Sequence, residues 1–164
     1  GVDQLKNLVY SINTNPDSRR LMISAWAPHE MNDMALPPCH YAFQVYINDG
    51  VMDLMWQQRS ADVFLGLPYD ISMYGLLLEM LAKGAGLKAG QLIGQLGDCH
   101  LYNNHFEQAK RYLNRPDIYS IPKLELSKGV TLEGSNVIIP EANEIKLNNY
   151  NPLPAIKAEL SVGK

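Results

Sequence analysis

The stretch from residue 41 to residue 57 reads Tyr41-Ala42-Phe43-Gln44-Val45-Tyr46-Ile47-Asn48-Asp49-Gly50-Val51-Met52-Asp53-Leu54-Met55-Trp56-Gln57. It contains two apolar runs rich in β-forming residues, from Tyr41 to Ile47 and from Val51 to Gln57. The Asp-Gly step between them is typical of a β-hairpin, because a tight hairpin turn needs positive φ angles that these two residues accept. The stretch therefore predicts two antiparallel strands joined by a short turn.

Helical patterns lie on both sides of this hairpin. Apolar residues recur at helical spacing from Val2 to Ile12, and Asn15-Pro16-Asp17 ends that helix. The strongest helical pattern of the chain runs from Ile71 to Lys83, and a further helix is expected from Asn103 to Leu113. The buried stripe expected for the 71–83 helix consists of Met73, Leu76, Leu77, Met80 and Leu81.

Strands and loops are expected in the rest of the chain. Leu21 to Trp26 predicts a strand, Ala27 to Pro38 a long loop, and Gln91 to Leu96 a buried strand. Because strands and helices mix without a regular βαβ rhythm, the pattern favours a single α+β domain over residues 1–164. Three more short strands are expected at Lys123 to Leu126, Val137 to Ile139 and Ile145 to Leu147.

Composition narrows the class of protein. The chain has 164 residues, of which 46% are hydrophobic and 19% charged, as is typical of a globular domain with its own core. Its formal net charge of −3 disfavours binding to duplex nucleic acid, which needs clustered basic residues. Two cysteines are too few for a disulfide-stabilised secreted domain, and neither a signal peptide nor a long apolar run is present. We therefore expect a cytoplasmic protein with no membrane partner and no bound metal.

Cys39 is a candidate nucleophile. It follows Pro37-Pro38, which make the backbone rigid, and His40 comes directly after it. The thiolate is the reactive form of cysteine, and a cation such as Arg59 would favour it if the fold brings the two together. The alternative is a buried free cysteine that acts as a small hydrophobic residue, and Cys39 alone does not exclude it.

Two pairs of residues could hold a phosphate group. Arg19-Arg20 lies between a helix and a strand, and Arg59-Ser60 follows another strand. A guanidinium group with a neighbouring hydroxyl suits a phosphate, because it offers two parallel donors and a third beside them. Surface ion pairs are the alternative for either pair taken alone.

Polar residues with suitable tips for a ligand occur at two more places. Asp62, Gly66 and Pro68 are expected in a turn that leads into the 71–83 helix, where the carboxylate could cap the helix or accept from ligand N–H groups. His100 and Tyr102 are two residues apart, and each could contact a hydroxyl group. A core histidine with satisfied hydrogen bonds is the alternative for His100.

The order of these motifs resembles the thymidylate synthase family, and the resemblance covers nearly the whole chain. The family implies an α+β fold with a large, twisted, mixed β-sheet flanked by helices, and a homodimer that forms through the sheet. The stretches that carry the resemblance are Asp17-Ser18-Arg19-Arg20, residues 34–40 (Met-Ala-Leu-Pro-Pro-Cys-His), residues 58–68 (Gln-Arg-Ser-Ala-Asp-Val-Phe-Leu-Gly-Leu-Pro), Gly97-Asp98, His100-Leu101-Tyr102 and Asn149-Tyr150-Asn151-Pro152.

The resemblance implies a reaction in which Cys39 attacks C6 of a pyrimidine deoxynucleoside monophosphate. The attack makes C5 nucleophilic, and C5 then takes up the one-carbon unit of 5,10-methylenetetrahydrofolate. Arg59 and His40 are expected beside the thiol. By resemblance, the remaining site residues are Arg19, Arg20, Arg59 and Ser60 for the phosphate, with Arg19 and Arg20 reaching across the dimer; Asp70 and Gln58 for the base; His100 and Tyr102 for the sugar; and Asp62, Leu65, Gly66 and Tyr69 for the folate.

The chain departs from the family pattern at its N-terminus. The resemblance implies a substantial preceding segment that carries another phosphate-binding arginine, a glutamate for proton transfer at the base, and tryptophans near the cofactor. The 164 residues of the chain do not include them. We therefore expect this chain alone to be inactive, and an inactive, truncated member that binds a nucleotide is one alternative.

A second departure is Asp70, where thymidylate synthases have Asn. An asparagine amide can donate to O4 and accept from N3 of uracil, whereas a carboxylate accepts from the 4-amino group of cytosine and, when protonated, donates to N3. Relatives that act on dCMP, such as phage deoxycytidylate hydroxymethylases, have Asp here. The residue thus favours dCMP, with two alternatives: a conventional synthase making dTMP from dUMP, or an Asp70 that only caps a helix beginning at Ile71.

The group added at C5 is a methyl or a hydroxymethyl group. Hydroxymethylases tend to replace the histidine after the nucleophile, so the presence of His40 favours methyl transfer. The family's last residues close over the cofactor, and the polar end Ser161-Val162-Gly163-Lys164 could change that closure and admit water. The sequence leaves both products open.

Overall fold

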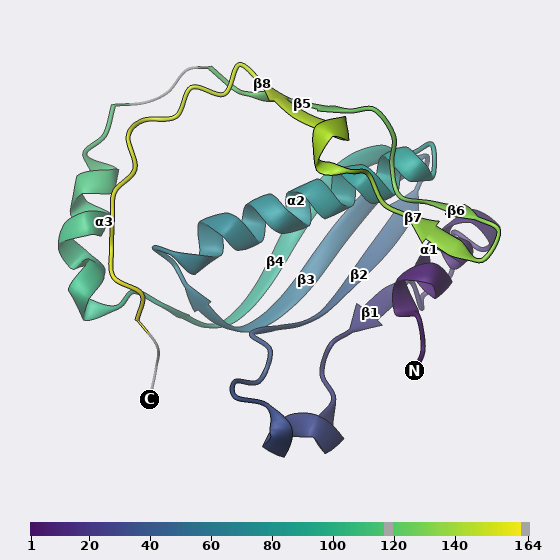
Figure 1. Ribbon diagram of the computed structural model, residues 1–164, viewed down its shortest axis with the longest axis horizontal. Helices are drawn as coiled ribbons and strands as arrows, with labels where there is room; N and C mark the ends of the chain where they lie inside the picture. The colour runs from purple at the N-terminus through teal and green to yellow at the C-terminus, as the bar shows by residue number, and fades with distance from the viewer. Residues whose placement is uncertain (117–119, 162–164) are drawn as a thin grey trace.

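A four-stranded mixed sheet forms the framework of the computed structural model, which describes residues 1–116 and 120–161 (Figure 1). The strands lie in the order β1-β2-β3-β4; the first three are antiparallel, and β4 is parallel to β3. Helix α2, Gly66–Gly84, connects β3 to β4 and covers one face of the sheet. The strands are β1 Met22–Ser24, β2 His40–Asn48, β3 Val51–Asp62 and β4 Lys88–His100.

The predicted hairpin is confirmed. Asn48 pairs with Val51 across a turn in which Asp49 and Gly50 have φ angles of 48° and 76°. Strand β3 runs beyond the expected Gln57, because its second half pairs with β4 on its other side as far as Asp62. The positions of Arg59, Ser60 and Asp62 are therefore corrected: these residues belong to a strand and not to the turn that follows it.

The core lies between β3 and α2. Alternate β3 residues from Met52 to Gln58 are buried and face the helix, as the two-residue period of a strand requires. The stripe predicted for the helix is confirmed in part: Leu81 is fully buried and Leu77 and Met80 pack against the core, whereas Met73 is 47% exposed. The helix is apolar on most of its sides, so the sheet and not the periodicity selects the buried face. The buried residues of α2 are Tyr74, Leu78, Leu81 and Ala82.

The N-terminal helix α1, Gln4–Thr14, packs beside the sheet. Asp3 caps it by accepting a hydrogen bond from the Lys6 amide, and Leu8, Val9 and Ile12 are buried. The following strand β1 is shorter than expected, and the long loop before Cys39 contains a 3-10 helix, η1, Pro28–Asp33.

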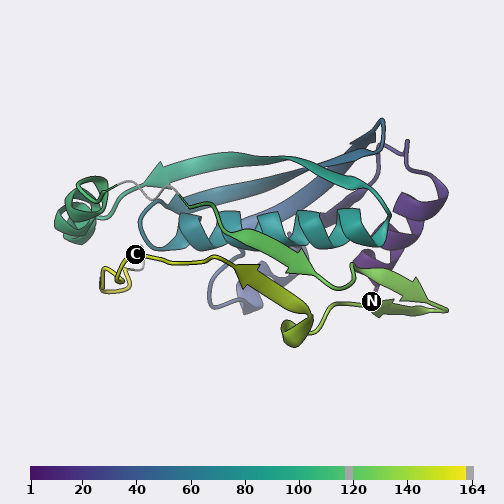
Figure 2. The same cartoon turned by 90° about the horizontal axis from the view of Figure 1, so that it is seen from above.

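The expectation that β4 is buried is wrong. It is the edge strand of the described sheet, and most of its residues are exposed. Figure 2 shows the reason: α2 covers one face of the sheet, and no described element covers the other. Residues on that open face include Tyr46 and Ile93, which are 63% and 41% exposed.

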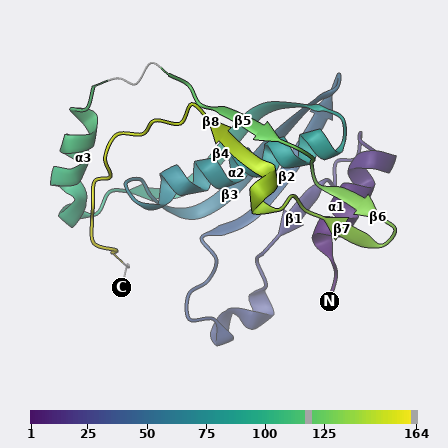
Figure 3. The ribbon, with the colours of Figure 1, turned by 45° about the horizontal axis from the view of Figure 1, so that its top comes forward.

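The C-terminal third forms small elements on the same side of the sheet as α2 (Figures 2 and 3). Strands β5 and β8 pair antiparallel, and β6 and β7 form a hairpin beside α1. The helix expected from 103 to 113 and the three expected short strands are confirmed, whereas β6 was not expected. The elements are η2 Asn103–His105, α3 Phe106–Leu113, β5 Lys123–Leu126, β6 Thr131–Glu133, β7 Asn136–Ile138, η3 Ala142–Glu144 and β8 Ile145–Asn148.

Within the described ranges, no helix is both long and apolar enough to cross a membrane. Of the polar C-terminal residues 161–164, only Ser161 is described, so the expectation about residues 162–164 lies outside the described part of the chain.

Candidate functional site

Strand pairing brings the candidate nucleophile to the candidate cation. His40 begins β2 and pairs with Gln58 of β3, and the Arg59 amide donates to the Cys39 carbonyl at 2.9 Å. Residues that are twenty positions apart in the sequence therefore lie side by side at one end of the sheet. The hairpin that decides the fold also assembles the centre of the site.

The Arg59 side chain holds the loop that carries the thiol. Its Nε donates to the Pro38 carbonyl at 3.1 Å, and its Nη2 donates to the Pro37 carbonyl at 2.8 Å. The same Nη2 lies 4.0 Å from Cys39 Sγ. Cys39 itself is a free, half-buried thiol. The arrangement places a fixed positive charge beside a partly accessible sulfur, which favours nucleophilic attack by the thiolate.

A closed ring of polar contacts lies next to Cys39. The Trp56 indole N–H donates to Gln58 Oε1 at 3.0 Å, and Gln58 Nε2 donates to Asp70 Oδ2 at 2.9 Å. Asp70 Oδ1 lies 3.2 Å from His40 Nε2. The ring closes where the Tyr74 hydroxyl lies 3.3 Å from His40 Nδ1 and the Tyr74 ring stacks on Trp56.

The ring is largely shielded from solvent. The Asp70 side chain is 13% exposed and that of His40 is 30% exposed. Burial, and then the nearby charge of Asp70, raise the pKa of the Tyr74 hydroxyl above its ordinary value. Tyr74 therefore keeps its proton at neutral pH, and its hydroxyl can donate to His40 Nδ1 or accept from it, depending on the tautomer of His40.

Asp70 is not a helix cap. Helix α2 begins at Gly66, so Asp70 lies at its fifth position, and the N-cap residue Leu65 makes no side-chain capping bond. The alternative in which Asp70 only caps a helix starting at Ile71 is therefore wrong. The carboxylate instead points at the ring of contacts beside Cys39.

Of the two roles that the sequence allowed for Asp62, binding ligand N–H groups or stabilising the start of the helix, the structure shows the second. Its Oδ1 accepts from the amides of Phe64 and Leu65, at 3.0 and 3.4 Å, and so holds the turn before α2. Gly66 begins the helix, contrary to the expected turn, and Tyr69 is 77% exposed beside it. The expected folate-binding residues thus cluster at the start of α2, and their role in binding remains a prediction.

The candidate sugar residues lie at the same end of the sheet. His100 ends β4 opposite Asp62, and its carbonyl accepts from the Val63 amide at 3.0 Å. The rings of His100 and Tyr102 meet edge to face at 4.9 Å. His100 Nδ1 also lies 3.4 Å from a carboxylate oxygen of Asp98, so a polar group of the chain orients this ring.

Arg19 and Arg20 are not brought to Cys39. Both are exposed in the loop before β1, and Met22 pairs with Gln44 of β2. Gln44 lies five positions along the extended chain from Cys39, which corresponds to about 17 Å. Ser60, by contrast, lies on β3 next to Arg59, and its carbonyl accepts from Gln58 Nε2 at 2.9 Å.

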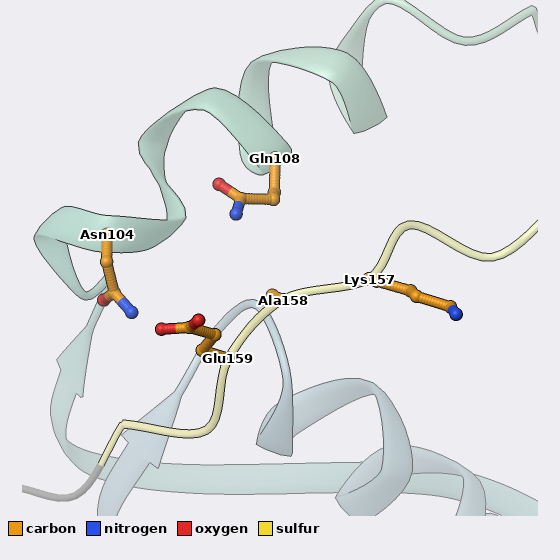
Figure 4. Close-up of a pocket in the computed structure, with 5 residues that line it drawn as sticks. All are labelled: Asn104, Gln108, Lys157, Ala158 and Glu159. Atoms are coloured by element: carbon orange, nitrogen blue, oxygen red, sulfur yellow. The ribbon is translucent and has the colours of Figure 1, made fainter.

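Two cavities of the described chain lie away from this site. One, of about 310 Å³, lies between α3 and the C-terminal segment, where Asn104, Gln108 and Glu159 converge and Lys157 points away (Figure 4). The other has a similar volume and lies between Arg19 and the end of β2. Neither contains Cys39.

Sequence reasoning missed three residues of this region. Trp56 and Tyr74 belong to the polar ring, and His105 is fully buried beside Phe64 and Tyr102. The spacing of four between Asp70 and Tyr74 was a usable signal, because such residues share one face of a helix.

Comparison with known proteins agrees with this arrangement. The family model described as "Thymidylate synthase" matches residues 1–162. A thymidylate synthase of Listeria innocua serovar 6a is 48% identical over 161 residues, which are 98% of this chain and 50% of that relative. A thymidylate synthase of Listeria monocytogenes serotype 4a is 49% identical over 162 residues, with the same two coverages.

The chain thus spans about half the length of the curated relatives that it matches. The family match nevertheless extends over nearly every residue of the chain and includes Cys39, Arg59 and Asp70. The chain belongs to the thymidylate synthase family.

Proposed function

We propose that this chain supplies the nucleophile and the base-recognition residues of an enzyme that transfers a one-carbon unit to C5 of a pyrimidine deoxynucleoside monophosphate. The observation that carries the proposal is that the Arg59 guanidinium lies beside the Cys39 sulfur, while the neighbouring residue Gln58 donates to the Asp70 carboxylate. A nucleophile with a cation at one side and a polar base-reading group at the other fits a planar, polar substrate.

The chemistry follows from this placement. The Cys39 thiolate adds to C6, the C5–C6 double-bond electrons move toward C5 and onto O4 of uracil or N3 of cytosine, and C5 becomes the nucleophile. Arg59 holds the thiol in position through the carbonyls of Pro37 and Pro38. Once C5 has bonded to the one-carbon unit and lost its proton, elimination of the Cys39 thiolate from C6 restores the C5–C6 double bond.

5,10-Methylenetetrahydrofolate is the proposed source of the one-carbon unit. The start of α2 fits a folate, because Tyr69 offers an exposed aromatic surface and Asp62 a carboxylate next to it. Tyr69 would pack against the flat ring system, and Asp62 would accept from its N–H groups.

We further propose that Asp70 selects dCMP over dUMP. Its Oδ2 already accepts from Gln58 and its Oδ1 faces His40, so the carboxylate is held in place beside the site. An ionised carboxylate attracts the 4-amino group of cytosine and repels O4 of uracil. The conventional alternative, dTMP synthesis from dUMP, has its own support in the names of the relatives and in the retained His40.

Titration calorimetry on the full-length protein with dCMP and dUMP tests the base choice. We expect dCMP to bind at least about tenfold more tightly, since mismatched buried polar groups discriminate strongly. Asp70→Asn should reverse the preference toward dUMP. Tight dUMP binding without dCMP binding by the unmodified protein would rule out the cytosine assignment.

Turnover with each nucleotide and methylenetetrahydrofolate tests the reaction. Mass analysis of the product distinguishes a methyl from a hydroxymethyl group, and Cys39→Ser should abolish both while nucleotide binding remains. Full activity of Cys39→Ser would exclude covalent catalysis by this residue. A chain of these 164 residues that binds nucleotide but makes no product would support the inactive, truncated alternative.

A homodimer and a cytoplasmic location complete the proposal. The face of the sheet away from α2 exposes Met22, Tyr46 and Ile93, which a second copy of the sheet could cover. Such a dimer would let Arg19 and Arg20 reach a partner's phosphate site. The two free cysteines suit a reducing compartment.

A further inference from the structure

Two aromatic side chains control the two groups that contact Asp70. Trp56 donates to Gln58, and Tyr74 contacts His40, while their own rings stack at 5.2 Å with an interplanar angle of 12°. We propose that Tyr74 is a positioning residue whose hydroxyl holds His40 in the tautomer with its hydrogen on Nε2. In this tautomer His40 donates to Asp70, and the Asp70 carboxylate remains an acceptor for the base. The part of this inference that concerns base choice rests on the proposed function.

The position of the Tyr74 hydroxyl is fixed by packing. Its ring lies between Trp56, on which it stacks, and Phe43, which it meets edge to face at 6.1 Å. Tyr74 is 6% exposed, so a substitution that keeps the ring keeps these contacts. The hydroxyl keeps its proton at neutral pH, and the Nδ1 atom of His40 lies within reach at 3.3 Å.

A hydrogen bond from Tyr74 to Nδ1 decides the state of the whole imidazole. A neutral ring carries one hydrogen, so an Nδ1 that accepts leaves the hydrogen on Nε2. That hydrogen faces Asp70 Oδ1 at 3.2 Å. The opposite tautomer would direct the Nε2 lone pair at a carboxylate oxygen, which is repulsive.

Gln58 is fixed in the corresponding way. Its Oε1 accepts from the Trp56 indole, so its amide nitrogen faces Asp70 Oδ2. Asp70 therefore receives one donor on each oxygen, from two different strands. Because each carboxylate oxygen has a second lone pair, both can still accept from a ligand.

These two donors matter because another carboxylate is near. A Cβ atom placed on Gly66 would lie 3.6 Å from Asp62 Cβ and 3.8 Å from Asp70 Oδ2, so both acidic side chains flank this glycine. A like charge favours protonation of a carboxyl group, and donors oppose it. A protonated Asp70 would lose the discrimination, because it could donate to O4 and accept from N3–H of uracil as well as accept from the 4-amino group and donate to N3 of cytosine. Tyr74 thus helps to exclude uracil without touching the base.

Tyr74→Phe is the direct test, since it removes the hydroxyl and keeps the ring. In the free full-length protein, nitrogen NMR of labelled histidine should show His40 as the neutral Nε2–H tautomer, and the variant should show a mixture. A His40→Gln variant identifies the resonances. The preference for dCMP over dUMP, measured by calorimetry, should fall about three- to tenfold, as expected for the loss of one hydrogen bond.

Tyr112→Phe is the matched control, because Tyr112 is 62% exposed on α3 and should change neither readout. An Nδ1–H or doubly protonated His40 in the unmodified protein overturns the proposal without any variant, as does an unchanged base preference in a folded Tyr74→Phe protein. If the unmodified protein prefers dUMP, the dCMP assignment fails separately. The His40 spectrum and the change caused by Tyr74→Phe still decide the role of Tyr74.

Discussion

Asp70 affects its neighbours through its charge as well as through hydrogen bonds. Burial is the main reason that the pKa of Tyr74 is raised, and the Asp70 charge adds to it. Both causes favour the neutral phenol in the folded protein. The titration of Tyr74 therefore reports the charge on Asp70 without any nucleotide.

We expect Asp70→Asn to lower the pKa of Tyr74 but to leave it above the ordinary value, because burial remains. A group whose pKa is raised on folding stabilises the protein below its unfolded pKa, about 10 for tyrosine, and loses this contribution as pH rises through the folded pKa. The variant should lose it at a lower pH than the unmodified protein.

Carbon NMR of labelled tyrosine between neutral and alkaline pH measures this shift. Asp98→Asn is the matched control, since it makes the same charge change beside His100 and away from Tyr74. A Tyr74 titration that does not respond to Asp70→Asn would show that Asp70 is uncharged or turned away.

Individual site residues were predictable where strand pairing alone places them. Once the hairpin was recognised, its register from Asn48 and Val51 put His40 opposite Arg59 and so brought Cys39 close to that arginine. An irregularity between His40 and Ala42 shifts the actual pairing of His40 to Gln58, and the turn did not predict this shift. The contact of Asp70 with both His40 and Gln58 was not predictable, because it depends on where α2 begins and how it lies on the sheet. A helix expected from Ile71 leaves Asp70 outside it.

At the scale of elements, glycine and proline residues explain why two elements extend beyond their expected bounds. The helix expected from Ile71 begins at Gly66, and the strand expected over 91–96 spans Lys88–His100. Helix α2 contains Gly66 and Pro68 in its first turn, where proline is tolerated because its missing N–H would have no partner. Strand β4 contains Gly94, whose added Cβ would lie 2.5 Å from the Trp56 ring. These residues lower helix and strand propensity, yet the close approach of other groups requires the glycine in β4.

The end of α2 provides a test of such a close approach. A Cβ on Gly84 would lie 1.8 Å from the Val130 carbonyl oxygen, a backbone atom, and the Val130 amide donates to Met80 at 2.9 Å. Gly84→Ala should therefore lower the free energy of unfolding by about 1–3 kcal/mol, because the segment at Val130 must move away from the helix.

Gly75→Ala in the same helix is the control with the opposite expected sign. Its Cβ would meet only Leu92 Cδ2 at 3.7 Å, an ordinary contact. We expect this change to stabilise the protein by up to about 1 kcal/mol through helix propensity. Urea denaturation of both variants measures the difference, and equal midpoints would show that the segment at Val130 is not packed on α2.

At the scale of the whole molecule, the C-terminal segment joins distant parts of the chain. From the end of β8 to Ser161, the last residue that the structure describes, it has no regular secondary structure and runs back along α3 (Figure 1). The Arg115 side chain donates to the Pro154 carbonyl, and Ser161 donates to Asn104 at 3.0 Å. These two contacts are exposed, so we expect them to contribute little to stability.

The segment also contacts His105, which is fully buried. The Nε2 atom of His105 lies 2.7 Å from the Glu159 carbonyl oxygen. His105 packs against Phe64 before α2 and against Tyr102, so it connects the segment to the end of the sheet that carries the candidate site. The contact of His105 with Glu159 is thus a buried hydrogen bond that holds the segment near α3.

His105→Leu should release the segment while keeping an apolar side chain between Phe64 and Tyr102. Losing a buried hydrogen bond costs about 1–2 kcal/mol, which corresponds to a five- to thirtyfold larger open population. Trypsin should therefore cleave after the exposed Lys157 faster by about that factor, and mass spectrometry of the fragments measures the rate.

Cleavage after Lys123 in β5 serves as the internal reference, and Ser161→Ala, which removes only an exposed contact, should leave the Lys157 rate nearly unchanged. An unchanged Lys157 rate in His105→Leu would mean that other contacts hold the segment, whereas equal acceleration at both lysines would indicate global unfolding.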